Sequence, residues 1–126
     1  MSAWLGVILG GAVGSALRYG VALAMGNKLG TEFPYGTLTV NVLGCLLIGC
    51  LAVLFTGPWA AKEELRLAVL VGGLGGFTTF SSFGLETLGL VNAGRWSAAL
   101  IYVTVSNMGG LLAVWVGSRL GRIIHG

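Results

Sequence analysis

One segment of thirteen residues combines the residue types from which a membrane protein can build an ion site. Residues 72–84 read Gly-Gly-Leu-Gly-Gly-Phe-Thr-Thr-Phe-Ser-Ser-Phe-Gly. Each glycine costs about 1 kcal/mol relative to alanine inside a helix, so the four glycines at the start predict a disrupted helix. A disruption frees carbonyl oxygens, which suit a hard cation such as Na⁺, and amide or hydroxyl donors, which suit an anion. The segment therefore indicates ion binding and leaves the sign of the ion open.

Other chemistries lack the residues that they need. The glycines are not followed by Gly-Lys-Ser/Thr, and no predicted strand precedes them, which excludes a phosphate-binding loop. The only histidine, His125, lies in the C-terminal tail, and no nucleophile–base pair is apparent. Cys45 and Cys50 have neither metal-ligand spacing nor the pattern of a disulfide framework, and we interpret them as small apolar side chains. We therefore predict that the chain is not an enzyme.

Phe80 and Phe83 are three residues apart and so share one face of a helix. Aromatic packing in a core is the usual explanation of such a pair. A phenyl ring, however, is weakly positive at its edge. Two ring edges aimed into a narrow path could replace part of the hydration shell of a small anion without trapping it, as conduction requires. Spacing alone leaves both interpretations open.

Polar side chains inside apolar runs are candidates for function because burying them in a bilayer is costly. Arg18 either snorkels to the headgroups or lines an electropositive vestibule. Glu86 is either a helix-end residue near water or part of a polar track. Asn41 either bonds a neighbouring helix or contacts an ion with its amide donors. Tyr102 and Ser106, four residues apart, share a face, and we interpret their hydroxyls as inter-helix hydrogen bonds worth about 0.6 kcal/mol each.

The elements that must position these residues are membrane spans. The chain has 126 residues, of which 56% are hydrophobic and 9% are charged. A soluble domain carries about 25% charged residues, so a soluble domain, a disordered chain and a nucleic-acid binder are excluded. A span needs about 20 mostly apolar residues, and the charges separate four such runs. We predict a single transmembrane domain over residues 1–126, with helices at 3–25, 37–55, 65–91 and 96–116 and connections at 26–36, 56–66 and 92–95.

Glycine spacing and loop charges bear on assembly. Gly6, Gly10 and Gly14 form a smooth stripe where another helix can approach closely. The side of the membrane with both termini holds four basic residues, and the other side holds two, or three if Arg18 snorkels there. The four are Lys62, Arg66, Arg119 and Arg122, and the two are Lys28 and Arg95. Such a weak bias allows insertion in both directions or in one. Two oppositely inserted copies would supply the symmetry that many transporters obtain from inverted repeats.

Four motifs follow one another in an order and spacing that cover nearly the whole chain. They are Gly10-Gly11-Ala12-Val13-Gly14-Ser15-Ala16-Leu17-Arg18-Tyr19, Gly36-Thr37-Leu38-Thr39-Val40-Asn41-Val42-Leu43-Gly44, Gly75-Gly76-Phe77-Thr78-Thr79-Phe80-Ser81-Ser82-Phe83 and Tyr102-Val103-Thr104-Val105-Ser106. In these motifs the chain resembles the Fluc (CrcB) family of bacterial fluoride channels. The third motif is the most specific, whereas the glycine-rich first motif alone would be weak.

The resemblance implies a fold and a mechanism. The fold is an all-α membrane protein with four transmembrane helices per subunit and a third helix broken mid-membrane. Two copies form an antiparallel, dual-topology homodimer in the lipid of the bacterial inner membrane. The dimer has two fluoride pathways and one central structural Na⁺, and it exports cytoplasmic fluoride passively.

The resemblance also assigns roles to residues. It implies that backbone carbonyls of Gly75 and Thr78 from both copies hold the Na⁺. The implied pathway residues are Asn41, Phe80, Phe83, Tyr102 and Ser106, with a polar track of Thr79, Ser81 and Glu86 and with Arg18 near a pore entrance. One departure is Gly110, where relatives often have serine. Water or another side chain would then rebuild that part of the track.

Two other functions compete with a channel. A small proton-coupled multidrug exporter is also a four-helix antiparallel dimer, but it needs a carboxylate deep in the membrane, usually in the first helix. The first run carries Arg18 and no acid, and Glu86 is the only acid within a predicted run. A non-transporting assembly subunit held by glycine stripes would pass no ion.

Overall fold

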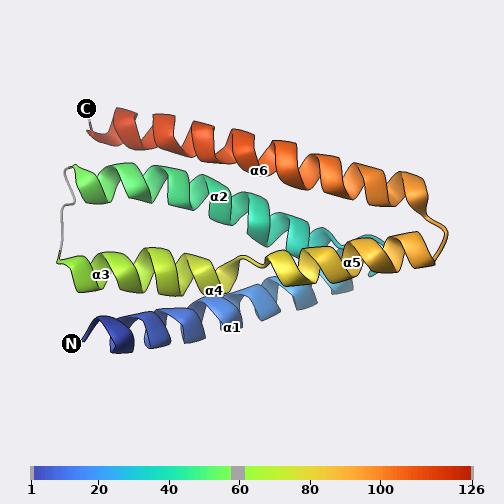
Figure 1. Cartoon of the computed structure of the whole chain (residues 1–126), viewed down its shortest axis with the longest axis horizontal. Helices are drawn as coiled ribbons and strands as arrows, with labels where there is room; N and C mark the ends of the chain where they lie inside the picture. Colours follow the sequence, from blue (N-terminus) through green and yellow to red (C-terminus); the bar gives the residue numbers. More distant parts are fainter. Residues whose placement is uncertain (1, 58–61, 126) are drawn as a thin grey trace.

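The computed structural model describes residues 2–57 and 62–125, and the elements in these ranges are helices. They are α1 (Ala3–Leu29), α2 (Tyr35–Thr56), α3 (Glu63–Leu67), the π-helical η1 (Ala68–Leu74), α4 (Gly75–Phe77), α5 (Phe80–Asn92) and α6 (Trp96–His125). Four segments are long and apolar enough to cross a membrane: α1, α2, the stretch Glu63–Asn92 from α3 to α5, and α6. α1 begins and α6 ends at the same end of the molecule (Figure 1). The prediction of an all-α chain with four spans is confirmed.

The helix ends differ from the predicted ones. α1 continues past residue 25 to Leu29, because nothing in this stretch stops a helix before Gly30, whose φ of 82° only glycine adopts freely. α2 begins at Tyr35, directly after Pro34. The first connection is therefore shorter than the expected loop at 26–36.

The other two differences concern charged helix ends. α3 begins at Glu63, so the last part of the expected connection at 56–66 is helical, and residues 58–61 lie outside the described ranges. Glu63 pairs with Arg66 one turn later at 2.6 Å, and acidic residues suit the first turn of a helix. α6 continues past residue 116 to His125. Arg119 and Arg122 lengthen the helix beyond its apolar part without breaking it.

α1 packs along η1 and α4 with direct backbone contact, as the glycine stripe predicts. A Cβ atom at Gly10 would overlap the carbonyl oxygen of Ala68, and one at Gly14 would overlap that of Gly73. Without side chains at these positions the two helices approach closely, which is how helices gain packing energy in lipid.

The glycine run 72–76 lies in the helical backbone of η1 and α4. Gly72 and Gly73 lie in a π-helix and not in a regular α-helix, and the chain leaves the helix only after the run, at Thr78 and Thr79. A Cβ at Gly72 would lie 2.6 Å from the Val7 carbonyl oxygen, and one at Gly76 would lie 2.8 Å from that of Gly11. Close packing against α1 explains glycine at both positions and overrides their low helix propensity.

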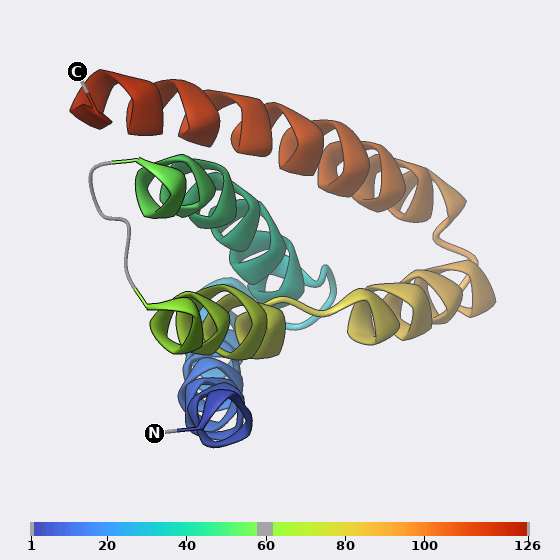
Figure 2. The same ribbon diagram turned by 60° about the vertical axis from the view of Figure 1, so that its left-hand side comes forward.

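α2 packs along α6 in the same manner, and α5 joins this second pair. A Cβ at Gly117 would overlap the Leu46 carbonyl oxygen, and one at Gly121 would lie 2.7 Å from that of Cys50. Figure 2 shows that α5 runs away from α1 and ends beside the start of α6. Leu90 of α5 packs there with Ala99 and Tyr102 of α6 in a small buried cluster.

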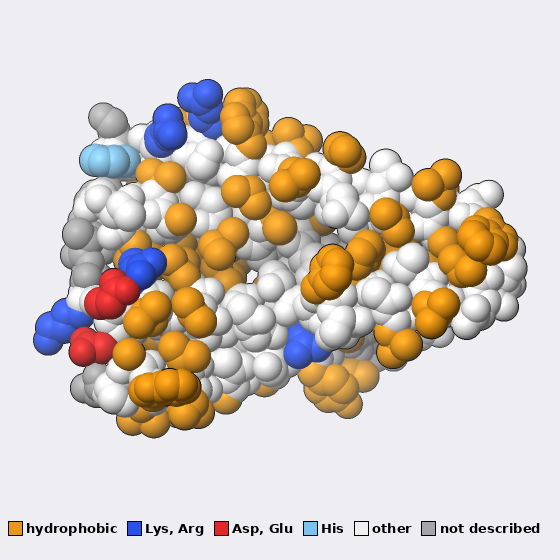
Figure 3. Space-filling view, in the orientation of Figure 1, with side chains coloured by type: hydrophobic (Ala, Val, Ile, Leu, Met, Phe, Trp, Pro, Cys, Tyr) orange, Lys and Arg blue, Asp and Glu red, His pale blue; other side chains and the backbone are white. Residues whose placement is uncertain are grey.

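The outer surface is apolar over most of its length. Large hydrophobic side chains are exposed on α1, α2, α5 and α6, and charged ones gather at the end with the α2–α3 connection (Figure 3). Such a surface is far larger than the apolar patches that soluble monomers expose. It fits contact with lipid and with other spans.

Candidate functional site

The site is built around two extended residues between α4 and α5. Thr78 has φ −90° and ψ 160°, and Thr79 has φ −154° and ψ 121°. Thr78 closes α4, since its hydroxyl donates to the Leu74 carbonyl oxygen at 3.0 Å. Thr79 begins α5, since its hydroxyl oxygen accepts the Ser82 N–H at 3.2 Å, as an N-cap does. Thr78 thus provides a hydrogen-bond donor for a carbonyl at the end of α4, and Thr79 provides an acceptor for an N–H at the start of α5.

Asn41 of α2 holds this link by a reciprocal pair of hydrogen bonds. The Thr79 N–H donates to Asn41 Oδ1 at 2.8 Å, and Asn41 Nδ2 donates to the Thr79 carbonyl oxygen at 3.0 Å. The predicted inter-helix bond of Asn41 is therefore present. Nδ2 carries a second hydrogen, so contact with an ion stays a prediction.

The same hydrogen bonds leave two carbonyls without their helical donors. In a continuous α-helix the Gly75 oxygen would accept the Thr79 N–H, and the Thr78 oxygen would accept the Ser82 N–H. Both donors are instead bound by side-chain oxygens. A Cβ at Gly75 would meet nothing within 4 Å, so there is space beside this backbone. Two carbonyl oxygens are hard donors that fit Na⁺, and a full coordination shell would need more of them, for example from a second copy.

Side-chain metal ligands do not compete with this assignment in the part of the chain that the structure describes. No group of three or more His, Cys, Asp or Glu side chains there could hold a metal ion. The sodium site predicted at the carbonyl oxygens of Gly75 and Thr78 stays a prediction.

Arg18 reaches inward to the end of α4. Its Nε donates to the Gly76 carbonyl oxygen at 3.1 Å, so a positive charge lies where a helix ends and its carbonyls point. The side chain also lines a cavity of 310 Å³ that Thr79 and Glu86 line as well. Both interpretations of Arg18, snorkelling to the headgroups and a place near a pore entrance, stay predictions.

Glu86 of α5 is tied to α2. The Thr37 hydroxyl donates to Glu86 Oε1 at 2.7 Å, which joins the two helices. Sequence reasoning did not select Thr37, although it precedes Asn41 by four residues and so shares its face of α2. Thr79 and Ser81, the other members of the predicted track, have their hydroxyl oxygens 3.4 Å apart.

Three cavities share lining residues and so lie next to one another. The first, of 370 Å³, is lined by Asn41, Thr79, Phe80, Phe83 and Ser106, among others. Thr79 also lines the cavity of 310 Å³, in which Thr37 and Glu86 take part. Thr37 and Glu86 in turn line a third cavity of 540 Å³ beside the α1–α2 connection. Arg18, Asn41, Thr79, Glu86 and Ser106 therefore line one or more of these neighbouring cavities, whereas Ser81 and Tyr102 line none of the three.

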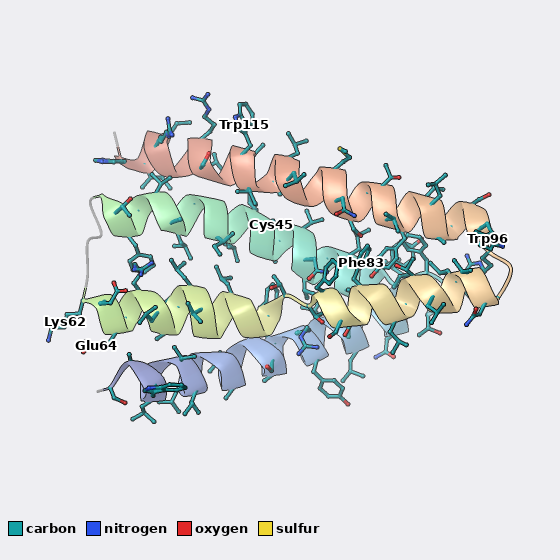
Figure 4. All side chains as sticks on the ribbon, viewed as in Figure 1. Cys45, Lys62, Glu64, Phe83, Trp96 and Trp115 are labelled. Atoms are coloured by element: carbon teal, nitrogen blue, oxygen red, sulfur yellow. The ribbon has the colours of Figure 1, made fainter. Side chains whose placement is uncertain are left out.

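Aromatic rings extend from the link towards α6. The ring centres of Phe80 and Phe83 are 5.6 Å apart, and those of Phe83 and Tyr102 are 5.0 Å apart. Figure 4 shows Phe83 between α5 and α6. Tyr102 is fully buried, whereas Phe80 is 81% exposed. The exposed ring of Phe80 is therefore free to contact lipid or another span.

The hydroxyls of Tyr102 and Ser106 bear on one interpretation. Both oxygens are buried and have no hydrogen-bond partner of standard geometry among the residues that the structure describes. The Tyr102 side chain nevertheless lies near Thr37 of α2 and Glu86 of α5, so its inter-helix hydrogen bond stays a prediction. A buried polar group without a partner costs about 1–3 kcal/mol. Such groups need water or a ligand.

Comparison with known proteins identifies the family. Residues 5–118 match the family described as CrcB-like protein, Camphor Resistance (CrcB). The chain belongs to the CrcB-like family. It is 46% identical over 122 residues to the fluoride-specific ion channel FluC of Chloroflexus aurantiacus, covering 97% of each protein. Over 122 residues it is 48% identical to the FluC of Magnetococcus marinus, and over 121 residues 40% identical to that of Legionella pneumophila strain Lens, covering 98% and 90% of these relatives.

Membership of this family confirms the resemblance found in the four motifs. Four membrane-spanning helices in a CrcB-like chain make it a multi-pass membrane protein. The relatives are named as ion channels, so this is a family of channels and not of enzymes, as predicted.

Replacing Asn41 tests whether its amide holds the extended link. Asn41→Ala removes both bonds to Thr79 and leaves a buried N–H unsatisfied, so we expect the free energy of unfolding to fall by about 2 kcal/mol and the Thr79 amide to exchange faster. Asn41→Asp keeps an acceptor and should preserve the protection of that amide. NMR-detected hydrogen exchange in micelles measures both. Asn107→Ala is the control, because Asn107 Nδ2 bonds only Val103 of its own helix. Equal Thr79 exchange in Asn41→Ala and Asn107→Ala would contradict the assignment.

Proposed function

We propose that the chain is a fluoride-selective channel that lets cytoplasmic fluoride leave a bacterium passively across the inner membrane. The observation that carries the proposal is the set of neighbouring cavities lined by hydrogen-bond donors and by the rings of Phe80 and Phe83, with Ser106, whose hydroxyl oxygen is buried, in the lining. The relatives are named fluoride-specific ion channels, which supports the same conclusion.

The lining suits a small, strongly hydrated anion. Fluoride gives up its water only where donors replace it. The second hydrogen of Asn41 Nδ2 and the Ser106 hydroxyl are such donors, and the edges of Phe80 and Phe83 add weak positive potential. None of these groups carries a full positive charge, so the ion is bound weakly enough to leave. We expect the path to be narrow, so that it disfavours the larger chloride.

Membrane potential is a sufficient driving force. Neutral HF enters from acidified surroundings and ionises in the cytoplasm. When a monovalent anion leaves a cell whose inside is negative, its free energy falls by about 2.3 kcal/mol per 100 mV of membrane potential. Passive conduction therefore keeps cytoplasmic fluoride low without ATP.

An antiparallel homodimer with two pores completes the proposal. Phe80, at 81% exposed, lies beside the link and would be covered by a second copy. The unpaired Gly75 and Thr78 carbonyls of one copy supply only part of a cation site. The weak bias of basic residues between the two ends allows both orientations. In this arrangement Thr78 and Thr79 form a helix break near mid-membrane.

A structural Na⁺ would be held by the carbonyl oxygens of Gly75 and Thr78 from both copies. When bound, it supplies fixed positive charge beside the pathways. The residues of the chain do the rest: Asn41 fixes the link, and Arg18 holds the last turn of α4.

Ion flux tests the function directly. Purified protein in liposomes should release fluoride far faster than chloride when a potassium ionophore sets the potential, because donors and a narrow path favour the smaller ion. A fluoride-selective electrode and a chloride electrode measure the two rates, with empty liposomes as the control. Comparable chloride flux would falsify fluoride selectivity, and no flux of either ion would favour a non-transporting subunit.

The two phenyl rings are tested by substitution. Phe80→Ile and Phe83→Ile remove an edge contact of about 1 kcal/mol, which predicts an approximately fivefold slower fluoride efflux from each variant. Phe55→Ile is the matched control, since Phe55 lines none of the three cavities. Size-exclusion chromatography verifies that assembly is unchanged. If both variants conduct at the rate of the control, these rings serve only packing.

The dimer and its cation are tested together by an experimental structure determined in sodium buffer. We expect two oppositely oriented copies, with Na⁺ between the Gly75 and Thr78 carbonyl oxygens of both. Replacing sodium by a large organic cation should remove that density and lower the thermal stability of the dimer. Parallel copies, or an axis free of density in sodium, would contradict this arrangement.

A further inference from the structure

Cys45 lies on the same side of α2 as the two polar residues already described. Thr37, Asn41 and Cys45 follow one another at intervals of four residues, which places them on one helical face. Cys45 lines the cavity of 370 Å³ together with Asn41, Phe83 and Ser106. Figure 4 labels it midway along α2.

The thiol occupies space that α6 leaves open. A Cβ atom at Gly110 would lie 3.3 Å from Cys45 Sγ, tighter than ordinary contact. One face of α6 carries, at intervals of four residues, Tyr102, Ser106 and Gly110. The first two have hydroxyls and Gly110 has no side chain, and the Cys45 thiol of α2 lies next to Gly110. A larger residue at Gly110 would have to displace the sulfur.

A second, independent observation points to a ligand beside this thiol. Ser106 is partly buried and lines the same cavity, and its hydroxyl oxygen is buried without a hydrogen-bond partner in the part of the chain that the structure describes. Such a group needs water or an ion. A thiol is a weak hydrogen-bond donor, so Cys45 and Ser106 offer two donors to one small occupant.

We propose that Cys45 is a further lining residue of the fluoride path, whose S–H replaces the side chain that Gly110 lacks. The proposal rests on the proposed channel function and names one more residue of that same path. It replaces the interpretation of Cys45 as apolar filler.

Moving the donor from one helix to the other tests this role. Cys45→Ala should lower fluoride efflux severalfold. Adding Gly110→Ser to Cys45→Ala returns a donor to the same space and should restore most of the efflux. Adding Gly110→Ala instead returns volume without a donor and should not. If the serine variant conducts no better than the alanine variant, or Cys45→Ala conducts like the unmodified chain, the proposal is overturned.

Chemical labelling gives a readout that does not depend on conduction. In Cys50→Ala, Cys45 is the remaining cysteine. Its thiolate attacks the sulfenyl sulfur of aminoethyl methanethiosulfonate, a mixed disulfide forms, methanesulfinate leaves and the thiol proton passes to water. We expect the corresponding mass increase and at least a tenfold loss of fluoride efflux, both reversed by dithiothreitol.

The matched control keeps the other cysteine. In Cys45→Ala the reagent should not change the remaining efflux, because Cys50 is outside the lining of the 370 Å³ cavity and packs its backbone against Gly121. Full labelling of Cys45 without loss of efflux, or no labelling in the folded protein, overturns the proposal while the channel function stands. If unlabelled Cys50→Ala and the unmodified chain both conduct no fluoride, the proposed function fails, and this inference fails with it.

Discussion

The reciprocal hydrogen bonds between Asn41 and Thr79 are the constraint on which the site depends. Backbone groups in a bilayer must find partners within the protein, and two extended residues remove the helical partners of several. Asn41 satisfies both backbone groups of Thr79, and Arg18 binds a carbonyl at the end of α4. The carbonyls of Gly75 and Thr78 are left over because their helical donors are bound elsewhere. Because side chains accept the N–H groups of Thr79 and Ser82, the carbonyl oxygens of Gly75 and Thr78 lose the donors that a continuous helix would give them.

Glycines at the contact between α1 and the η1–α4 segment make the Arg18 hydrogen bond possible, because they let α1 approach closely enough for Arg18 to reach the end of α4. Gly14 and Gly76 each lie where a Cβ would press on backbone of the opposite helix. Their absence of side chains draws the two helices together, and the Arg18 guanidinium then meets the Gly76 oxygen at 3.1 Å. Larger side chains along this contact would separate the helices and withdraw the charge. The position of the Arg18 positive charge at the link therefore depends on the close packing of α1 against η1 and α4.

The sequence predicts what depends on local pattern and less of what depends on contacts between helices. Four spans, the shared face of Phe80 and Phe83 and the family all follow from hydropathy, spacing and ordered motifs. The continuity of the helix through residues 72–76 does not, because contact with α1 overrides the low propensity of glycine. For Asn41 the sequence leaves two interpretations, and only the position of Thr79 selects the inter-helix bond. The hydrogen bonding of the Tyr102 hydroxyl could not be predicted from the sequence, because a polar group on any neighbouring helix could have bonded it.

A two-residue link between helices also explains why one place can serve ions of opposite sign. The carbonyl end of α4 and the amide end of α5 meet there, so partial negative and partial positive charge lie side by side. A cation fits the carbonyl end, where Gly75 has space beside it. An anion fits the donor side, where Ser106 is unpartnered and the ring of Phe80 is exposed. Each ion lowers the electrostatic cost of the other, because a bound positive charge near the link attracts the anion without contacting it. In the proposed channel the cation would stay fixed while the anion moves, because the anion must bind weakly enough to leave.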